Sequence, residues 1–204
     1  IARVQEMALK TRSPFIQIND SGGARIQEGV YSLDGYGKIF CNNIHASGVI
    51  PQISLILGPC AGGAAYSPAI TDFVYMVDNV SQMYITGPDV IKAVTGEDVT
   101  HDALGGAAAH AKKSGNAHFH CKDETECFAH VRKLLSYMPV NNTLPPPRAE
   151  EQPKASATGR IAQIIAERAT KAYDMHDIIE EIFDADSFLE VHQEYALSII
   201  VGFA

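Results

Sequence analysis

The sequence has few cysteines, few basic residues and no long apolar run. Its four cysteines are too sparse for a disulfide framework, so a reducing compartment is expected. The 16 lysines and arginines face 24 aspartates and glutamates, and the net charge of −8 argues against a nucleic-acid-binding surface. No segment approaches the roughly 18 uninterrupted apolar residues of a membrane span. These absences leave a soluble globular protein of one or two domains.

Two catalytic signatures are also missing. The Gly-x-Ser-x-Gly motif does not occur, and no histidine is placed locally to activate Ser21 or Ser67, so a serine hydrolase is not expected. The residues most like metal ligands gather in one stretch, but their spacing matches no zinc signature, and we expect no metal site. These residues are His118, His120, Cys121, Cys127 and His130.

The most informative feature that is present is a pair of Gly-Gly turns, Gly22–Gly23 and Gly62–Gly63. Each turn follows an apolar run that predicts a buried strand, and helical sequence comes after it. Glycine lets the backbone turn through angles that a Cβ atom would forbid, and it lets a ligand approach the main chain closely. Free N–H groups at the beginning of a helix favour anionic oxygens.

Two such donors converging on one point would form an oxyanion hole from backbone alone. We therefore predict that the N–H groups of both glycine pairs act together, although close helix–sheet packing without chemistry is the alternative for each turn. Glu28 is a candidate base, but an ion pair with Arg25 at a helix end is favoured. Arg25 is also a candidate contact for a cofactor phosphate. Backbone donors without a side-chain catalyst suit enolate formation from a thioester, with the second reagent supplied by a cofactor.

Strands and helices are expected to alternate over the first 138 residues, which predicts an α/β fold with a mainly parallel sheet and right-handed crossovers. Apolar runs and 3.6-residue periodicity locate these elements. The strands are expected at 15–19, 51–57, 73–77, 83–85 and 117–120, and the helices at 1–12, 28–47, 62–70 and 102–113.

Three details of the later helices are also predicted. Thr86 is expected to be the N-cap of one helix, with a proline early in its first turn. Gly105–Gly106 indicates tight helix packing rather than a dinucleotide site. Another helix is expected to begin with Asp123 and Glu126, and four of its residues should face the core: Phe128, Val131, Leu135 and Met138.

Proline and glycine usage divides the chain. Residues 139–159 hold 5 of the 10 prolines and predict an extended linker. Beyond it, apolar spacing predicts helices around 161–165 and 175–183, and strands at 188–191 and 195–204. The chain opens at Ile1 inside an amphipathic pattern and closes on an apolar run, so we expect it to be part of a longer polypeptide.

Several ordered motifs make the sequence resemble a known family, the carboxyltransferase subunit of biotin-dependent acyl-CoA carboxylases. The resemblance is strongest to the propionyl-CoA carboxylase β chain and methylmalonyl-CoA carboxyltransferase type, and it covers nearly the whole chain. The motifs are DSGGARIQEG at 20–29, GPCAGGA at 58–64, ITGP at 85–88, VTGE at 94–97, LGGA at 104–107 and LLSY at 134–137.

The resemblance implies the crotonase (Clp-protease-like) ββα superhelix, which a complete subunit contains twice. Residues 1–138 would be an acyl-CoA-binding N-terminal domain that lacks its opening strands. Residues 139–159 would be the linker, and residues 160–204 the truncated start of a similar C-terminal domain. The biotin-side oxyanion turn would lie beyond Ala204, so this stretch alone is expected to be inactive.

The resemblance also implies a reaction and its participants. The two glycine turns would hold the enolate of a short-chain acyl-CoA, propionyl-CoA favoured, while biotin on a partner protein delivers the carboxyl group. A biotin carboxylase and biotin carboxyl carrier subunit are the implied partners, in a hexamer whose sites lie at dimer interfaces. The cytoplasm of a bacterium or the mitochondrial matrix of a eukaryote is the implied location. The implied substrate-binding residues are Ala24, Arg25, Ala61, Ala64 and Tyr66.

Three other functions stay open at this point. The same turns would serve the carboxyltransferase subunit of a biotin-dependent decarboxylase or a transcarboxylase. A crotonase-type hydratase or isomerase would need carboxylates over the thioester carbons, and only Glu28 lies near either turn. A non-catalytic assembly module is the third alternative.

Overall fold

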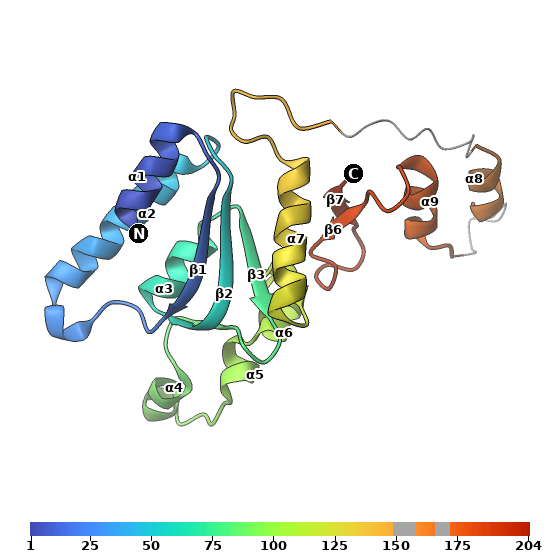
Figure 1. Cartoon of the computed structure of the whole chain (residues 1–204). Coiled ribbons are helices and arrows are strands. Elements are labelled where there is room, and N and C mark those ends of the chain that lie inside the picture. Colours follow the sequence, from blue (N-terminus) through green and yellow to red (C-terminus); the bar gives the residue numbers. More distant parts are fainter. Residues whose placement is uncertain (149–157, 166–171) are drawn as a thin grey trace.

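The computed structural model describes residues 1–148, 158–165 and 172–204, and its centre is a parallel sheet (Figure 1). The strands β1 (Phe15–Ser21), β2 (Gln52–Ala61), β3 (Phe73–Val77) and β5 (Phe119–Cys121) lie side by side in that order. A short strand, β4 (Gln82–Tyr84), also pairs with β2, and every pairing in this sheet is parallel. The predicted α/β architecture with a parallel sheet is confirmed.

Helices cover both faces of this sheet (Figure 1). On one side lie α1 (Ala2–Thr11), α2 (Val30–Ala46) and α3 (Gly63–Ala69), and on the other lies α7 (Glu124–Tyr137). Side chains alternate along the strands, so Ile53 and Leu55 of β2 join the core under α7, whereas Ile56 and Cys60 join the core under α3. Because both faces of the sheet are buried at β2, the sequence of this strand is a near-continuous run of apolar residues.

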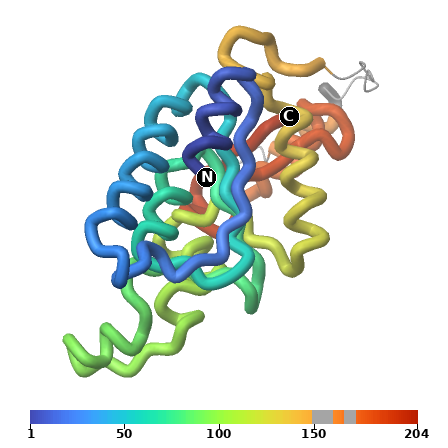
Figure 2. The backbone as a smooth tube through the Cα atoms, turned by 60° about the vertical axis from the view of Figure 1, so that its left-hand side comes forward, coloured from blue at the N-terminus to red at the C-terminus, as the bar shows by residue number. Residues whose placement is uncertain are grey.

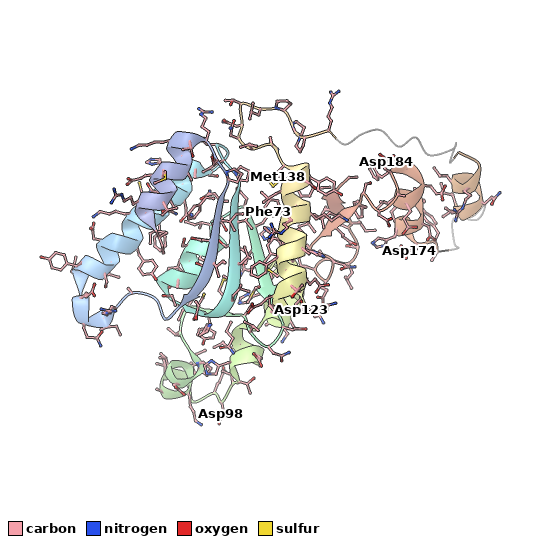
Figure 3. All side chains as sticks on the ribbon, viewed as in Figure 1. Phe73, Asp98, Asp123, Met138, Asp174 and Asp184 are labelled. Carbon is pink, nitrogen blue, oxygen red and sulfur yellow. The ribbon has the colours of Figure 1, made fainter. Side chains whose placement is uncertain are left out.

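The capping of α7 follows the sequence, but its core face differs from the prediction. Asp123 accepts a hydrogen bond from the Glu126 N–H at 2.8 Å, and Glu126 accepts one from the Lys122 N–H at 2.7 Å (Asp123 is labelled in Figure 3). The prediction of Phe128 as a core residue was wrong, because its side chain is 38% exposed. The buried positions are Cys127, Val131 and Leu134, while Leu135 and Met138 pack at the margin of that core.

Three boundaries between 58 and 114 also differ from the prediction. β2 continues to Ala61, so Gly58–Ala61 belongs to the strand rather than to the turn. α4 (Pro88–Thr95) has Gly87, not Thr86, at its N-cap. The helix predicted at 102–113 is divided into α5 (His101–Gly105), α6 (Ala107–Ala109) and a π-helical turn, His110–Ser114.

The division of that helix is caused by contacts of Gly105 and Gly106 with the segment around β4. Gly106 adopts an extended conformation and forms an antiparallel bridge with Gln82, which interrupts the helical hydrogen bonds. A Cβ on Gly105 would lie 2.2 Å from the carbonyl oxygen of Met83. Tight packing at these glycines, expected from the sequence, is confirmed.

The end of the chain forms α8 (Thr158–Ile164), α9 (Met175–Ile182), β6 (Leu189–Val191) and β7 (Val201–Phe203). β6 and β7 pair antiparallel, and the strand predicted over 195–204 is confined to β7. Leu189 and Val191 join the core under α7, and β6 and β7 are the part of this segment that lies beside that helix (Figure 1 and Figure 2). In the described ranges, no helix is both long and apolar enough to cross a bilayer.

The predicted linker, 139–159, is described over 139–148 and at its last two residues, where α8 begins, and 149–157 lie outside the described residues. Its first part packs back on the preceding unit. The buried Asn141 donates to the carbonyl of Arg12 at 2.9 Å, and Arg12 donates to the Asn142 side chain at 3.1 Å. The domain boundaries predicted at 138 and 160 stay predictions.

Candidate functional site

The first glycine turn follows β1 and is shaped by Ser21 and Gly23. The Gly23 N–H donates to Ser21 Oγ at 3.2 Å, and Gly23 has φ of +93°, which L side chains rarely adopt. A helix was predicted after this turn, and α2 does follow it, but not directly. A 3-10 turn, Ile26–Glu28, and Gly29 separate this glycine pair from α2.

The second glycine turn joins β2 directly to α3. Gly62 is the N-cap of α3, with φ of +55°, and Gly63 is its first residue. The Gly62 N–H is engaged, because it donates to the carbonyl oxygens of Tyr84 and Ile85, each at 3.2 Å. These bonds tie the turn to the end of β4 and the residue that follows it.

The two turns lie against each other, backbone to backbone. A Cβ built on Gly23 would lie 2.5 Å from the Ala61 carbonyl oxygen and 3.6 Å from the Gly63 nitrogen. A register shift allows this approach, because the pairing of β1 with β2 moves from Asn19–Ile56 to Ser21–Cys60. The structure therefore brings together two turns that are forty residues apart in the sequence.

The candidate donors for an anionic oxygen are the amides of Gly63 and Ala64. Both belong to the first turn of α3, where N–H groups have no intrahelical acceptor. Neither N–H has a hydrogen-bond partner among residues 1–148, 158–165 and 172–204. Two amides in this position can donate hydrogen bonds to a carbonyl oxygen that gains negative charge.

The side chains predicted to contact substrate differ in how far they are buried. Ala64 is buried, Ala24 and Ala61 are half-buried, and Tyr66 is 44% exposed. Arg25 extends into solvent, 73% exposed, and its Nη1 pairs with Glu28 Oε1 at 3.1 Å. The expected ion pair between Arg25 and Glu28 is confirmed.

Neither Ser67 nor Cys60, both near the second turn, is activated as a nucleophile. Ser67 is buried, and its hydroxyl donates to Asn43 Oδ1 at 3.0 Å within a network that includes Gln17 and no histidine. Burial raises the pKa of the Cys60 thiol to about 11, although the backbone of Ser21 opposes the shift, so the thiol stays protonated at neutral pH. Neither side chain therefore replaces the backbone amides as the candidate reactive group of this site.

The histidines between 118 and 130 line a separate pocket of about 50 Å³. His120 lies between two carboxylates, with Nε2 2.6 Å from Asp78 Oδ1 and Nδ1 2.5 Å from Glu194 Oε1. The two buried cysteines predicted beside these histidines, Cys121 and Cys127, are not among the residues that line the pocket. Among the described residues, no three histidine, cysteine, aspartate or glutamate side chains are grouped so that they could hold a metal ion.

Sequence reasoning missed the neighbours that shape the second turn. Tyr36, from the middle of α2, lies against Gly63, and the carbonyls of Tyr84 and Ile85 hold Gly62. No local signal marks these contacts, because they join segments that are more than twenty residues apart. In the first turn, by contrast, the hydrogen bond from the Gly23 N–H to Ser21 Oγ has a local signal, because a serine hydroxyl commonly accepts from the turn amide two residues later.

The model of the carboxyl transferase domain family matches residues 1–204. A propionyl-CoA carboxylase carboxyltransferase subunit from Haloferax mediterranei is 51% identical over 205 residues, all of this chain and 40% of that protein. A methylmalonyl-CoA decarboxylase subunit alpha from Veillonella parvula is also 51% identical, with the same coverage. The chain thus spans about two fifths of the length of these relatives.

The solved structures include a transcarboxylase 12S hexamer with hydrolysed methylmalonyl-coenzyme A bound. That chain is 48% identical to this one, and its structure matches with a TM-score of 0.96 over all of this chain and 40% of its own length. The likeness confirms the crotonase-type α/β fold expected from the sequence.

Proposed function

The chain belongs to the carboxyl transferase domain family, and we propose that it forms the acyl-CoA half of a biotin-dependent carboxyltransferase. The reaction is transfer of a carboxyl group from carboxybiotin to the α-carbon of a short-chain acyl-CoA, with propionyl-CoA favoured. The observation that carries this proposal is the meeting of the two glycine turns beside the amides of Gly63 and Ala64, which have no hydrogen-bond partner in the described part of the chain.

The backbone amides account for the acyl half of the chemistry. When the α-carbon of the thioester gives up a proton, which biotin would take up as it releases the carboxyl group, negative charge moves onto the carbonyl oxygen. Two N–H donors that are fixed in advance stabilise that charge more than they stabilise the neutral thioester, and the difference lowers the barrier. Removal of one such donor typically costs about 2.7–4 kcal/mol of transition-state stabilisation.

In this proposal the four predicted glycines have unequal roles. Gly63, with Ala64, is the donor in this proposal, whereas Gly62 and Gly23 shape the turns, since their own N–H groups are engaged. Gly22 stays a candidate donor. Ala24, Ala61, Arg25 and Tyr66 are proposed to contact the bound acyl-CoA.

Carboxybiotin would supply the carboxyl group, and no residue of this chain is assigned to it. We place its site in a C-terminal domain of which residues 160–204 would be the start, with 1–138 as the acyl-CoA domain and 139–159 as the linker. A biotin carboxylase and a biotin carrier subunit are the proposed partners, in a hexamer located in the bacterial cytoplasm or the mitochondrial matrix.

A second candidate is the carboxyltransferase subunit of a decarboxylase or transcarboxylase. The decarboxylase subunit from Veillonella parvula is as similar to this chain as the Haloferax carboxylase subunit, 51% identical. The glycine turns serve both directions of transfer equally. A hydratase or isomerase has less support, because Glu28, its candidate base, is paired with Arg25.

The test uses the complete subunit, purified with its natural partners. Carboxylation of propionyl-CoA that depends on ATP and bicarbonate supports the carboxylase, and comparison with acetyl- and butyryl-CoA gives the chain-length preference. Loss of carboxylate from methylmalonyl-CoA without ATP supports the decarboxylase. Hydration of an enoyl-CoA in the absence of biotin would contradict both.

A further inference from the structure

The ring of Tyr36 lies on the α-carbon of Gly63. A Cβ built on Gly63 would lie 2.8–2.9 Å from three carbon atoms of that ring, closer than real Cβ atoms approach their neighbours. Gly63 does not have a positive φ, in contrast to Gly62. The Tyr36 ring, not the backbone conformation, is therefore what restricts position 63 to glycine.

Tyr36 is held in this position by other aromatic rings. Phe40, one helical turn further along α2, lies 5.9 Å from Tyr36 between ring centroids, and the ring of Tyr66 on α3 lies 6.4 Å from that of Phe40. Tyr36 also packs against the core that contains Ala64. The three rings thus join α2 to α3 at the point where the glycine turn begins.

The direction of the Gly63 N–H depends on this contact. Gly63 has no side chain of its own to anchor it, and glycine is the residue with the greatest backbone freedom. The Gly62 N–H fixes the turn from one side through Tyr84 and Ile85, and the Tyr36 ring bounds it from the side of α2. Small displacements of a donor reduce electrostatic stabilisation of a transition state strongly.

We infer that Tyr36 is a positioning residue, whose ring holds the Gly63 amide in the direction that the acyl oxyanion requires. The inference rests on the proposed function, because it assigns Tyr36 a role only through the Gly63 donor. The aromatic ring is what acts, and the hydroxyl group is not needed.

The test compares Tyr36→Phe and Tyr36→Ala in the complete subunit with its partners, with Gly35→Ala as the matched control. Gly35 adjoins Tyr36 on α2, and a Cβ there meets no atom within 4 Å. We expect Tyr36→Phe and Gly35→Ala to keep kcat within about twofold. Tyr36→Ala should lower kcat at least tenfold while KM for propionyl-CoA changes less than threefold, as for an interaction made in the transition state.

A double-mutant cycle separates positioning from general packing. Gly63→Ala alone should lower kcat, because its Cβ meets the ring, and the same change should cost at least fivefold less when Tyr36 is already alanine. Additive losses would overturn the inference, as would wild-type kcat in Tyr36→Ala. If Tyr36→Ala fails to assemble, Tyr36→Leu replaces it in the same cycle. Absence of transfer in the wild type would instead refute the proposed function.

Discussion

The backbone of Gly23 is packed onto the carbonyl oxygen of Ala61, only 2.5 Å from where a Cβ atom of residue 23 would lie. This contact joins the turn after β1 to the turn after β2, and it exists because the two strands are parallel neighbours that end at the same edge of the sheet. The candidate site is thus a property of the pairing of two strands rather than of either motif alone.

Gly23→Ala is expected to impair both stability and transfer. The new Cβ would collide with a backbone oxygen, and alanine would also be strained at φ of +93°. We expect the complete subunit to lose about 2–4 kcal/mol of stability and most of its kcat.

The matched control for that change is Gly48→Ala. Gly48 has φ of +70°, but its Cβ would meet no atom within 4 Å, so this variant carries the backbone strain without the collision. Denaturant unfolding and transfer assays on both variants separate the two effects. Equal losses in the two variants would contradict the close approach of the turns.

Tyr75→Phe is expected to leave the protein as stable as the wild type, or more stable by up to about 1 kcal/mol. Tyr75 is fully buried, its ring stacks on Phe119 at 4.4 Å between centroids, and its hydroxyl has no partner in the described part of the chain. Removal of an unsatisfied buried hydroxyl relieves a desolvation penalty.

Tyr137→Phe is the contrasting variant for Tyr75→Phe. The Tyr137 hydroxyl donates to the carbonyl of Ser187, so its loss should lower stability by about 1 kcal/mol. Thermal unfolding of both variants measures the difference. A Tyr75→Phe variant less stable than Tyr137→Phe would show that the buried hydroxyl has a partner.

The attachment of residues 187–203 to the sheet is expected to depend on pH through His120. Burial disfavours the His120 cation, but the hydrogen bonds that the cation donates to Asp78 and Glu194 prevail and raise its pKa, and Lys112 pairs with Glu194 from the other side. Because the pKa of His120 is raised in the folded state, the stabilisation that His120 gives to this attachment is complete below its unfolded pKa of about 6.5. It is lost as the pH rises through the folded pKa.

Hydrogen exchange of peptides from 187–195, corrected for intrinsic rates, checks this dependence. Protection should fall as the pH rises above about 6.5 in the wild type and in the control variant His45→Gln, whose side chain is exposed. In His120→Gln, the protection of these peptides should depend much less on pH. A decline of equal size in His120→Gln would assign the effect to another group, such as His176, whose pKa Glu190 and Asp174 also raise.

The sequence predicted the sheet and the two glycine turns because their causes are local. Continuous apolar runs mark buried parallel strands, and glycine marks the turns, as at Gly62 with its φ of +55°. The broken helix near Gly106 could not be predicted in this way, since its cause is a bridge to Gln82, twenty-four residues earlier.

The same distinction applies to the site. The sequence was enough to expect that Gly23 and Gly62 shape the backbone. It could not show which amides are engaged in hydrogen bonds, because the acceptors of the Gly62 N–H are the distant carbonyls of Tyr84 and Ile85. Tyr36 was missed for a similar reason, since only the packing of α2 on α3 brings it to Gly63. Tertiary contacts decide which members of a predicted motif remain free for chemistry.

The measurement that tests the central proposal most directly is carboxyl transfer to propionyl-CoA by the complete subunit carrying Gly63→Val, beside the wild type and Gly35→Ala. The branched side chain would collide with the Tyr36 ring and obstruct the amide, so we expect assembly to persist while kcat falls about 10²–10³-fold, the usual effect of losing one oxyanion donor. Gly35→Ala should transfer at the wild-type rate. Wild-type turnover by an assembled Gly63→Val subunit would show that the acyl oxyanion is not bound at this turn.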